Sequence, residues 1–361
     1  MRFPEFSGEW KKCIIQDYGE VVTGNTPPTN NAEYYNNGSY LWASPADLGI
    51  NKNVTDTKTK LSLSGFKKTR NVPKGSVLVT CIGSTIGKMG MATETMSSNQ
   101  QINSVVVNDK NNSDFVYYAI CRAFPRYLSE VGVQAVPILS KSNFEKLPNY
   151  TTSRDEQNKI GYFLSLLDER IATQNKIIDK LQSLIKGLAV ALTTKGKPNI
   201  AISQCLECHS STLQESEVLP NGLYKVFGAN GLVGYTDVPQ MSSDAILVIK
   251  DGSGVGTVSY AQGKFSVIGT LNYLTAIGNI DLRYLYFALS VFNFQPYKTG
   301  MAIPHIYFKD YGKAKIYCPP LAEQKHVANV LGKLESKLFV EQGLLALFNQ
   351  QKQYLLGQMF I

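Results

Sequence analysis

Several short motifs in this sequence combine residue types that could do chemistry. Cys205-Leu206-Glu207-Cys208-His209 has the spacing of a c-type haem attachment site, and its thiols and imidazole could also bind zinc. Haem attachment requires an oxidising export route, and the opening residues contain no apolar signal segment. Zinc requires a second Cys/His pair, whereas His305 and His326 are isolated. We therefore expect ordinary cysteines in a loop or strand.

Two glycine-rich segments look like nucleotide-binding loops. Gly83-Ser84-Thr85-Ile86-Gly87-Lys88 has one residue too few between its glycines for a phosphate loop, and Met89 stands where Ser or Thr would hold magnesium. Gly252-Ser253-Gly254-Val255-Gly256 is only part of a dinucleotide-binding pattern. Because both segments occupy the same place in an internal repeat, we expect one shared backbone turn and no nucleotide site.

Catalytic signatures are incomplete. Cys318-Pro319-Pro320-Leu321 lacks the Asn or Asp and the aromatic residue of the adenine methyltransferase motif. Glu335-Ser336-Lys337 has nuclease-like spacing without a preceding Asp, and three scattered histidines form no nucleophile–base pair. The sequence predicts no active site, cofactor or metal in this chain. An enzyme with an unrecognised site stays open as an alternative.

Basic residues are the remaining polar signal. The formal net charge is +8, and six cations occur between residues 57 and 75 without an acidic residue. Lys and Arg neutralise phosphates, so DNA binding is one interpretation, and a solvated surface is the other. The candidate DNA-binding residues are Lys58, Lys60, Lys67, Lys68, Arg70, Lys74, Arg122, Arg126, Lys225, Lys250, Lys298, His305 and Lys309.

Two stretches with helical periodicity must position these residues. From Arg154 to Leu192, and again from Leu321 onward, apolar residues alternate at intervals of four and three. This pattern is typical of a long helix that packs along another helix. The predicted seam consists of Ile160, Leu164, Leu167, Ile171, Ile178, Leu181, Val327, Leu331, Leu334, Leu338, Leu345 and Phe348.

The two helical stretches belong to copies of one module. Glu156-Gln157 matches Glu323-Gln324 at an offset of 167, and the polar interruptions Gln174 and Glu341 match at the same offset. A repeat of this length is too long for a solenoid unit. It indicates a duplicated module in which a globular part precedes a long helix.

The predicted fold is therefore α+β with an internal pseudo-two-fold repeat. Two globular mixed α/β domains are joined by two long antiparallel helices that form a coiled-coil spacer. The predicted parts are an N-terminal domain (1–152), a central helix (153–195), a C-terminal domain (196–320) and a C-terminal helix (321–361). In each domain a helix is expected at matching places, over Phe115–Phe124 and Leu282–Phe292.

Composition is that of an ordinary globular protein. Hydrophobic residues make up 43% of the chain and charged residues 18%, and no window of 18 apolar residues predicts a membrane span. Six cysteines in 361 residues do not form a disulfide scaffold. We expect reduced thiols and a cytoplasmic location.

Motifs and architecture together resemble one family, the specificity (S) subunits of type I restriction-modification systems. The similarity extends over the whole chain. The matching segments are Arg2–Trp10, Gly24-Asn25-Thr26-Pro27, Trp42–Leu48, the Gly83-Ser84 turn, and the Pro137 and Pro304 segments that precede each Glu-Gln-containing helix. Phe227-Gly228-Ala229-Asn230-Gly231-Leu232 stands in the second half where Gly-x-Thr-Pro is expected, so the halves should read different sequences.

The resemblance implies two target recognition domains, each reading one half of a bipartite double-stranded DNA target. It implies that the helices act as a spacer and dock methyltransferase (M) subunits, two being expected. Restriction (R) subunits would join through the complex, and S-adenosylmethionine, ATP and magnesium would bind on these partners. No membrane partner is implied. The alternatives are a self-contained DNA methyltransferase or nuclease, and a structural coiled-coil scaffold.

Overall fold

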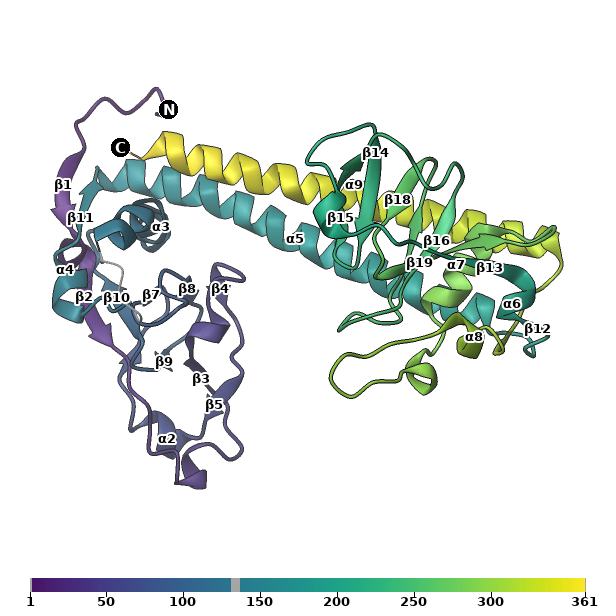
Figure 1. Ribbon diagram of the computed structural model, residues 1–361. Coiled ribbons are helices and arrows are strands. Elements are labelled where there is room, and N and C mark those ends of the chain that lie inside the picture. Colours follow the sequence, from purple (N-terminus) through teal and green to yellow (C-terminus); the bar gives the residue numbers. More distant parts are fainter. Residues whose placement is uncertain (1, 131–136, 361) are drawn as a thin grey trace. The chain divides into compact units, whose positions relative to one another are not determined.

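The computed structural model describes residues 2–130 and 137–360, and the chain divides into two compact units. The first unit comprises Met1–Lys176 and Gly343–Ile361, and the second comprises Ile177–Gln342. Each unit thus contains one globular part and a segment of each long helix (Figure 1). Among the described residues no helix is both long enough and apolar enough to span a membrane.

The structure contains two long helices, as the sequence predicts. Helix α5 (Arg154–Thr193) and helix α9 (Leu321–Met359) are each continuous, which confirms that prediction. In the first unit the two helices run antiparallel, because Lys352 pairs with Asp168 at 2.5 Å while the Arg170 guanidinium lies 5.7 Å from the Phe348 ring centre. In the second unit the C-terminal end of α5 lies beside the N-terminal end of α9.

The globular part of the first unit contains two larger sheets, a two-stranded pair and several helices. The five-stranded sheet has the order β2 (Gly19–Thr23), β10 (Ile102–Val107), β7 (Val77–Thr80), β8 (Met89–Ala92) and β4 (Asn53–Val54). The four-stranded sheet has the order β5 (Thr59–Leu61), β3 (Tyr40–Ala43), β9 (Met96–Ser98) and β6 (Asn71–Val72). A further pair joins β1 (Lys11–Ile14) to β11 (Pro148–Thr151), and the short helices are α1 (Ile15–Tyr18), α2 (Leu63–Phe66) and α4 (Lys141–Glu145).

Strand β7 lies between two apolar layers. Val77 and Val79 belong to the core that includes α3 (Ser113–Glu130) and both long helices, whereas Leu78 belongs to the core shared with the four-stranded sheet. A strand covered on both faces needs apolar residues at successive positions. This explains why Val77, Leu78 and Val79 are apolar at successive positions.

The second unit repeats this plan with shorter connections. One sheet has the order β13 (Leu206–Ser210), β19 (Leu271–Ala276), β16 (Ala245–Ile249) and β17 (Val258–Ala261), and the other has β15 (Gly231–Thr236), β14 (Tyr224–Gly228) and β18 (Phe265–Val267). Strand β12 (Ile200–Ala201) pairs with β20 (Lys315–Ile316), and the helices are α6 (Ile202–Cys205), α7 (Leu282–Ser290) and α8 (Phe308–Tyr311). Strands β7 to β10 and helix α3 match β16 to β19 and helix α7 at an offset of 169, which confirms the internal repeat.

Helix α3 is longer than predicted. It continues beyond Phe124 through Pro125 to Glu130, although proline usually ends a helix. Tyr127 follows that proline, is 1% exposed, and its hydroxyl donates to the Pro148 carbonyl at 2.6 Å. Tertiary packing of this turn therefore outweighs the local cost of the proline.

A buried glutamine anchors each long helix to the globular part before it. Gln157 is 2% exposed; its Nε2 donates to the Thr152 carbonyl at 2.9 Å, and its Oε1 accepts from the Asn112 backbone N–H at 2.9 Å. Gln324 makes the equivalent bonds, to the Pro319 carbonyl at 2.7 Å and from the Asp281 N–H at 2.9 Å. The paired Glu-Gln motifs of the sequence are therefore structural anchors.

The glutamate that precedes each of these glutamines pairs with a basic side chain. Glu156 is fully buried and accepts two hydrogen bonds of 2.7 Å from Arg2, while Glu323 pairs with Lys195. Burial raises the pKa of Glu156, but the hydrogen bonds from Arg2 and Thr152 outweigh burial and hold that pKa below its ordinary value. The carboxylate is therefore charged and paired at neutral pH.

Candidate nucleic-acid interface

The two glycine-rich segments form the same tight turn. Gly83 and Gly87 have φ of 96° and 90°, and Gly252 and Gly256 have φ of 97° and 88°. In both units a strand, not a helix, follows the turn, so the helix N-terminus that a phosphate loop requires is missing from these segments. The geometry agrees with one shared backbone turn, as the sequence predicted.

Asn25 organises the loop that carries the main basic stretch. Its side chain donates to the Lys68 carbonyl at 2.9 Å and accepts from the Arg70 backbone N–H at 2.8 Å. Its carbonyl accepts from the Trp42 indole at 3.1 Å. The Gly-Asn-Thr-Pro segment therefore serves as the support on which Lys67, Lys68 and Arg70 are displayed.

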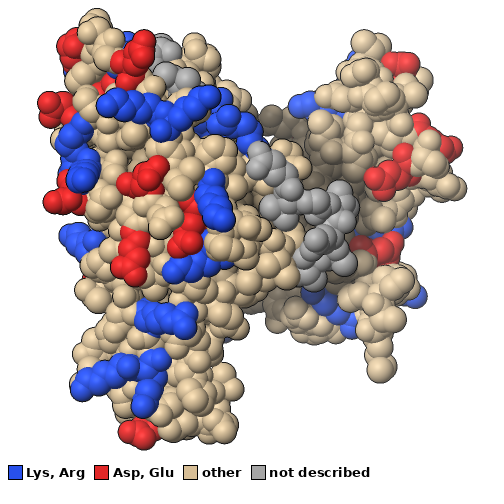
Figure 2. Space-filling view, turned by 90° about the vertical axis from the view of Figure 1, so that its left-hand side faces the viewer, with Lys and Arg blue, Asp and Glu red and all other residues tan. Residues whose placement is uncertain are grey.

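These cations lie on the solvent side of the loop. Lys67, Lys68 and Arg70 are exposed, and so is Lys74 beyond strand β6. The Arg70 guanidinium donates to the Thr23 carbonyl at 3.0 Å, which fixes its direction, and a carbonyl, unlike a carboxylate, leaves the positive charge in place. Figure 2 shows that the charged side chains on the lower part of this face, around α2, are mostly Lys and Arg.

Although residues 57–75 contain no acidic residue, two cations at one end of this stretch lie close to a carboxylate. Lys60 pairs with Asp56 at 2.8 Å, just before residue 57, and Asp47 accepts from the Lys58 backbone N–H at 2.9 Å. Both lysines belong to the β5 side of the sheet. Their charge is therefore partly compensated, unlike that of Lys67 and Lys68.

Two further candidates of the first unit lie elsewhere. Arg122 and Arg126 are on helix α3, whose residue Phe124 packs against the Gly87 turn. Arg126 is exposed, whereas the Arg122 Nε atom is buried and has no hydrogen-bond partner among the described residues. The candidate residues of the first unit therefore lie in separate places, some on the Asn25-supported loop and the neighbouring β5 side, and others on helix α3.

Four candidates of the second unit are brought together by one loop. The Lys250 carbonyl accepts from the Ile306 N–H at 2.9 Å, and the His305 Nδ1 lies 2.7 Å from Asp251 Oδ1. Lys298 is half-buried and precedes the same loop, and Lys309 is exposed and follows it. Lys225 is exposed on strand β14, outside this group.

The same loop has an exposed apolar tip that the sequence analysis did not identify. Thr299 and His305 exchange two backbone hydrogen bonds, of 2.9 and 2.7 Å, and so close the loop. Met301 is fully exposed and Ile303 is 58% exposed. Gly300, with φ of 87°, was the local signal, because such backbone favours glycine in a tight loop.

The cysteine motif forms no metal site. Cys205 is buried in α6, Cys208 lies in β13, and burial raises their pKa to about 12 and about 11, respectively. His209 stacks on Tyr273 with ring centres 5.1 Å apart. In the described part of the chain, no three His, Cys, Asp or Glu side chains cluster as metal ligands would. These thiols are protonated core residues.

The predicted seam residues are sheltered from solvent. Seven are buried and the other five are half-buried, which is the burial expected of one face of a packed helix. The buried ones are Ile160, Leu164, Leu167, Ile178, Leu181 and the pair Val327 and Leu331; Ile171, Leu334, Leu338, Leu345 and Phe348 are half-buried. Gln174 is also buried, at 5% exposure, so the polar slot belongs to the same face.

Comparison with known proteins places both halves of the chain in one family. The model of the type I restriction modification DNA specificity domain matches residues 7–183 and 206–348. The HindI specificity subunit of Haemophilus influenzae is 26% identical over 49% of this chain and 40% of its own length, and the MjaIX specificity subunit of Methanocaldococcus jannaschii is 30% identical over 48% and 42%. The chain thus spans less than half the length of these two relatives.

Longer matches have lower identity. The EcoprrI specificity subunit of Escherichia coli is 20% identical over 87% of this chain and 84% of that protein. The crystal structure of a type I restriction-modification S subunit from M. genitalium has a TM-score of 0.70 at 19% identity, with 98% of this chain and 96% of that one covered. This structural likeness shows a shared fold. Because the family model matches most of the chain, in two copies, the protein belongs to the type I restriction-modification DNA specificity family.

Proposed function

We propose that the chain is the specificity subunit of a type I restriction-modification complex and that each globular domain reads one half of a bipartite DNA target. The observation that carries the proposal is the duplication. Two equivalent globular parts each precede a long helix, α5 or α9, and the family model matches residues 7–183 and 206–348. Duplex DNA presents equivalent major-groove faces about every 34 Å, so two similar domains suit a target in two halves.

We propose that DNA contacts the Asn25-supported loop of the first unit and the surface around the loop that Thr299 and His305 close in the second unit. In the first unit the supported cations Lys67, Lys68 and Arg70 supply phosphate contacts. In the second unit Lys298 and Lys309, on either side of the loop that Thr299 and His305 close, do so. The two surfaces differ in sequence and in their supporting segments, which fits two different half-sites.

The long helices are proposed to dock the M subunits, which supply S-adenosylmethionine chemistry, while R subunits with ATP and magnesium join through the complex. In the first unit a groove of about 670 Å³ runs between α5 and α9. Phe163 and Leu166 on α5, together with Leu344 on α9, are between 37% and 42% exposed there. An apolar groove between helices suits the apolar face of a partner helix.

Domain exchange tests the proposal. The complex of this chain with its M subunits is used to methylate genomic DNA, and the modified sites are mapped. Replacement of residues 196–320 by the equivalent domain of another specificity subunit should change one half-site and leave the other intact. A hybrid with two new half-sites would contradict independent reading. A wild-type complex without salt-sensitive DNA affinity would favour a purely structural scaffold.

A further inference from the structure

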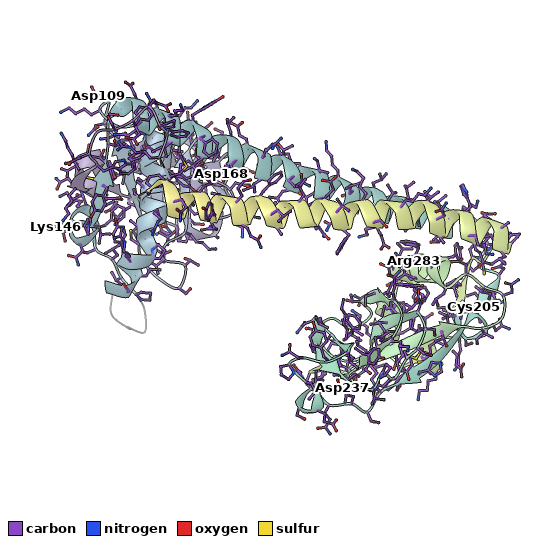
Figure 3. The ribbon with its side chains drawn as sticks, turned by 90° about the horizontal axis from the view of Figure 1, so that it is seen from above. Asp109, Lys146, Asp168, Cys205, Asp237 and Arg283 are labelled. Carbon is purple, nitrogen blue, oxygen red and sulfur yellow. The ribbon has the colours of Figure 1, made fainter. Side chains whose placement is uncertain are left out.

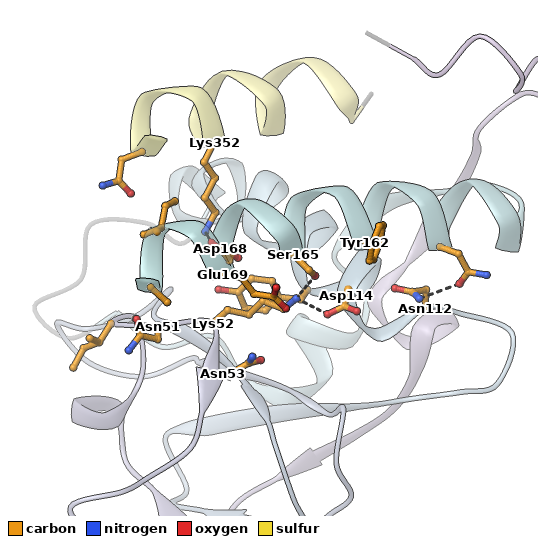
Figure 4. A pocket seen from close by; sticks show the side chains of 17 residues that line it. Asn51, Lys52, Asn53, Asn112, Asp114, Tyr162, Ser165, Asp168, Glu169 and Lys352 are labelled. Carbon is orange, nitrogen blue, oxygen red and sulfur yellow. Dashed lines mark hydrogen bonds and ion pairs between the residues drawn. The ribbon is translucent and has the colours of Figure 1, made fainter. Parts of the chain in front are cut away.

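In the first unit a lysine is buried where the globular part meets both long helices. The Lys52 side chain is 6% exposed, and its Nζ donates to Asp114 of α3 and, at 2.6 Å, to Ser165 of α5. The same Nζ lies 4.9 Å from the ring centre of Tyr118. Figure 4 shows Lys52 reaching from its loop toward Asp114 and Ser165.

A second set of bonds continues from this lysine to helix α9. The Tyr118 hydroxyl donates to Asp168 of α5 at 2.5 Å, and Lys352 of α9 pairs with the same carboxylate. One cluster thus connects a loop, helix α3 and both long helices. It borders a cavity of about 650 Å³ that is lined largely by Asn, Asp and Lys side chains.

Lys52 is the part of this cluster that belongs to the sheet. Its carbonyl accepts from the Met91 N–H of β8 at 2.7 Å, and Asn53 begins the edge strand β4. Helix α3 and the long helices share one apolar core, so they form a continuous frame. The Lys52 side chain therefore ties the edge of the five-stranded sheet to that frame.

The second unit has the same junction with the charges distributed differently. The Tyr286 hydroxyl donates to Glu335 at 2.7 Å, as Tyr118 does to Asp168, and Arg283 of α7 pairs with Glu335 and lies 4.3 Å from the Tyr260 ring centre. Asp168 and Arg283 are labelled in Figure 3. Arg283 occupies the repeat position of Asp114, so in this unit the cation comes from the short helix itself.

We propose that Lys52 is a positioning residue for DNA recognition by the first domain. Its buried ammonium group fixes the orientation of the recognition sheets relative to the helices and so sets the register of the first half-site. This role rests on the proposed function, because it presumes a bipartite target. A buried lysine with two partners holds one geometry, since any other would leave its charge unpaired.

The test uses the complex with M subunits and targets whose half-sites are separated by the preferred spacing or by one base pair more or fewer. The ratio of methylation at the preferred spacing to that at the others is measured for wild type and Lys52→Met. We expect the ratio to fall about tenfold, with the bases preferred in each half-site unchanged. Met keeps most of the length of the side chain and removes the ammonium group, and Asp114, whose side chain is 37% exposed, stays solvated without its partner.

Lys141→Met is the matched control, because Lys141 pairs with Glu145 on the surface of the same unit and belongs to no candidate DNA-binding group, and its ratio should equal that of wild type. Asp114→Asn is the second variant, used if Lys52→Met unfolds, and its ratio should fall in the same direction. A folded Lys52→Met complex with the wild-type ratio, or one that loses base preference equally at every spacing, overturns the role of Lys52. A wild-type complex that methylates no bipartite target overturns the proposed function and the role with it.

Discussion

Replacing three cations of the Asn25-supported loop gives a quantitative test of DNA contact. The variant Lys67→Gln/Lys68→Gln/Arg70→Gln retains the hydrogen bonds between the Asn25 side chain and this loop, because these bonds use the backbone carbonyl of residue 68 and the backbone N–H of residue 70. The fold should therefore persist while three positive charges are removed. Binding of the M-containing complex to duplex DNA is measured between 50 and 200 mM salt.

The expected magnitude follows from counterion release. Each phosphate contact contributes about 0.9 to the slope of log K against log salt, so three contacts contribute about 2.7. Over a fourfold change in salt the wild-type affinity should vary about 40-fold more than that of the variant. The loss should be similar for every DNA sequence, since phosphates carry no sequence information.

The control for this experiment is Lys60→Gln, in the same stretch. Its ammonium group already pairs with Asp56, so its removal should leave the slope nearly unchanged. A triple variant with an unchanged slope and unchanged sequence preference would show that the loop is only a solvated surface. Loss of preference at one half-site, with the slope intact, would indicate base contacts in place of phosphate contacts.

Two other perturbations address the spacer and the repeated turn. Deletion of residues 174–180 and 341–347 removes one heptad from each long helix and should shorten the gap between half-sites by about 10.5 Å, or about three base pairs. A methylation map should show both half-sites unchanged. Altered half-site bases with an unchanged gap would refute the spacer role. Gly256→Ala should lower the free energy of unfolding by about 2–5 kcal/mol, because a Cβ there would combine left-handed backbone with a 2.9 Å approach to Phe294. In Gly252→Ala the added Cβ would meet no atom within 4 Å, so only the left-handed backbone should lower the free energy of unfolding, by about 1–2 kcal/mol. Equal urea midpoints for the two variants would contradict this reasoning.

The long helices and the repeat were predictable because their signals are local or periodic. Seam residues recur every three or four positions along a single element, so no knowledge of distant contacts is required. The pairing of the short strands was not predictable in this way. Strand β4 has two residues, and it pairs in parallel with β8, 38 positions further on, through a contact that no local pattern announces.

Of the candidate DNA interface, only the run of basic residues could be predicted from the sequence. The basic stretch stands out in the sequence, but the compensation of Lys60 depends on a residue just outside it. Lys52 gave no signal, because a single lysine in a loop is ordinarily a surface residue. Its partners Asp114 and Ser165 lie 62 and 113 positions away, and only the folded chain brings these charges together.

The first unit is discontinuous in sequence, and this has a consequence for how the protein is synthesised. Its core contains Leu355, Leu356 and Met359 of α9 packed with Leu164 of α5. On the ribosome all of the second unit, Ile177–Gln342, must be made before these residues emerge. At ordinary elongation rates of about 5–20 residues per second, the apolar face of α5 stays uncovered for roughly 10–30 s. The nascent first unit is therefore a client for chaperones in that interval, while the second unit, whose helix segments and domain are contiguous in the chain, can close as soon as it is released.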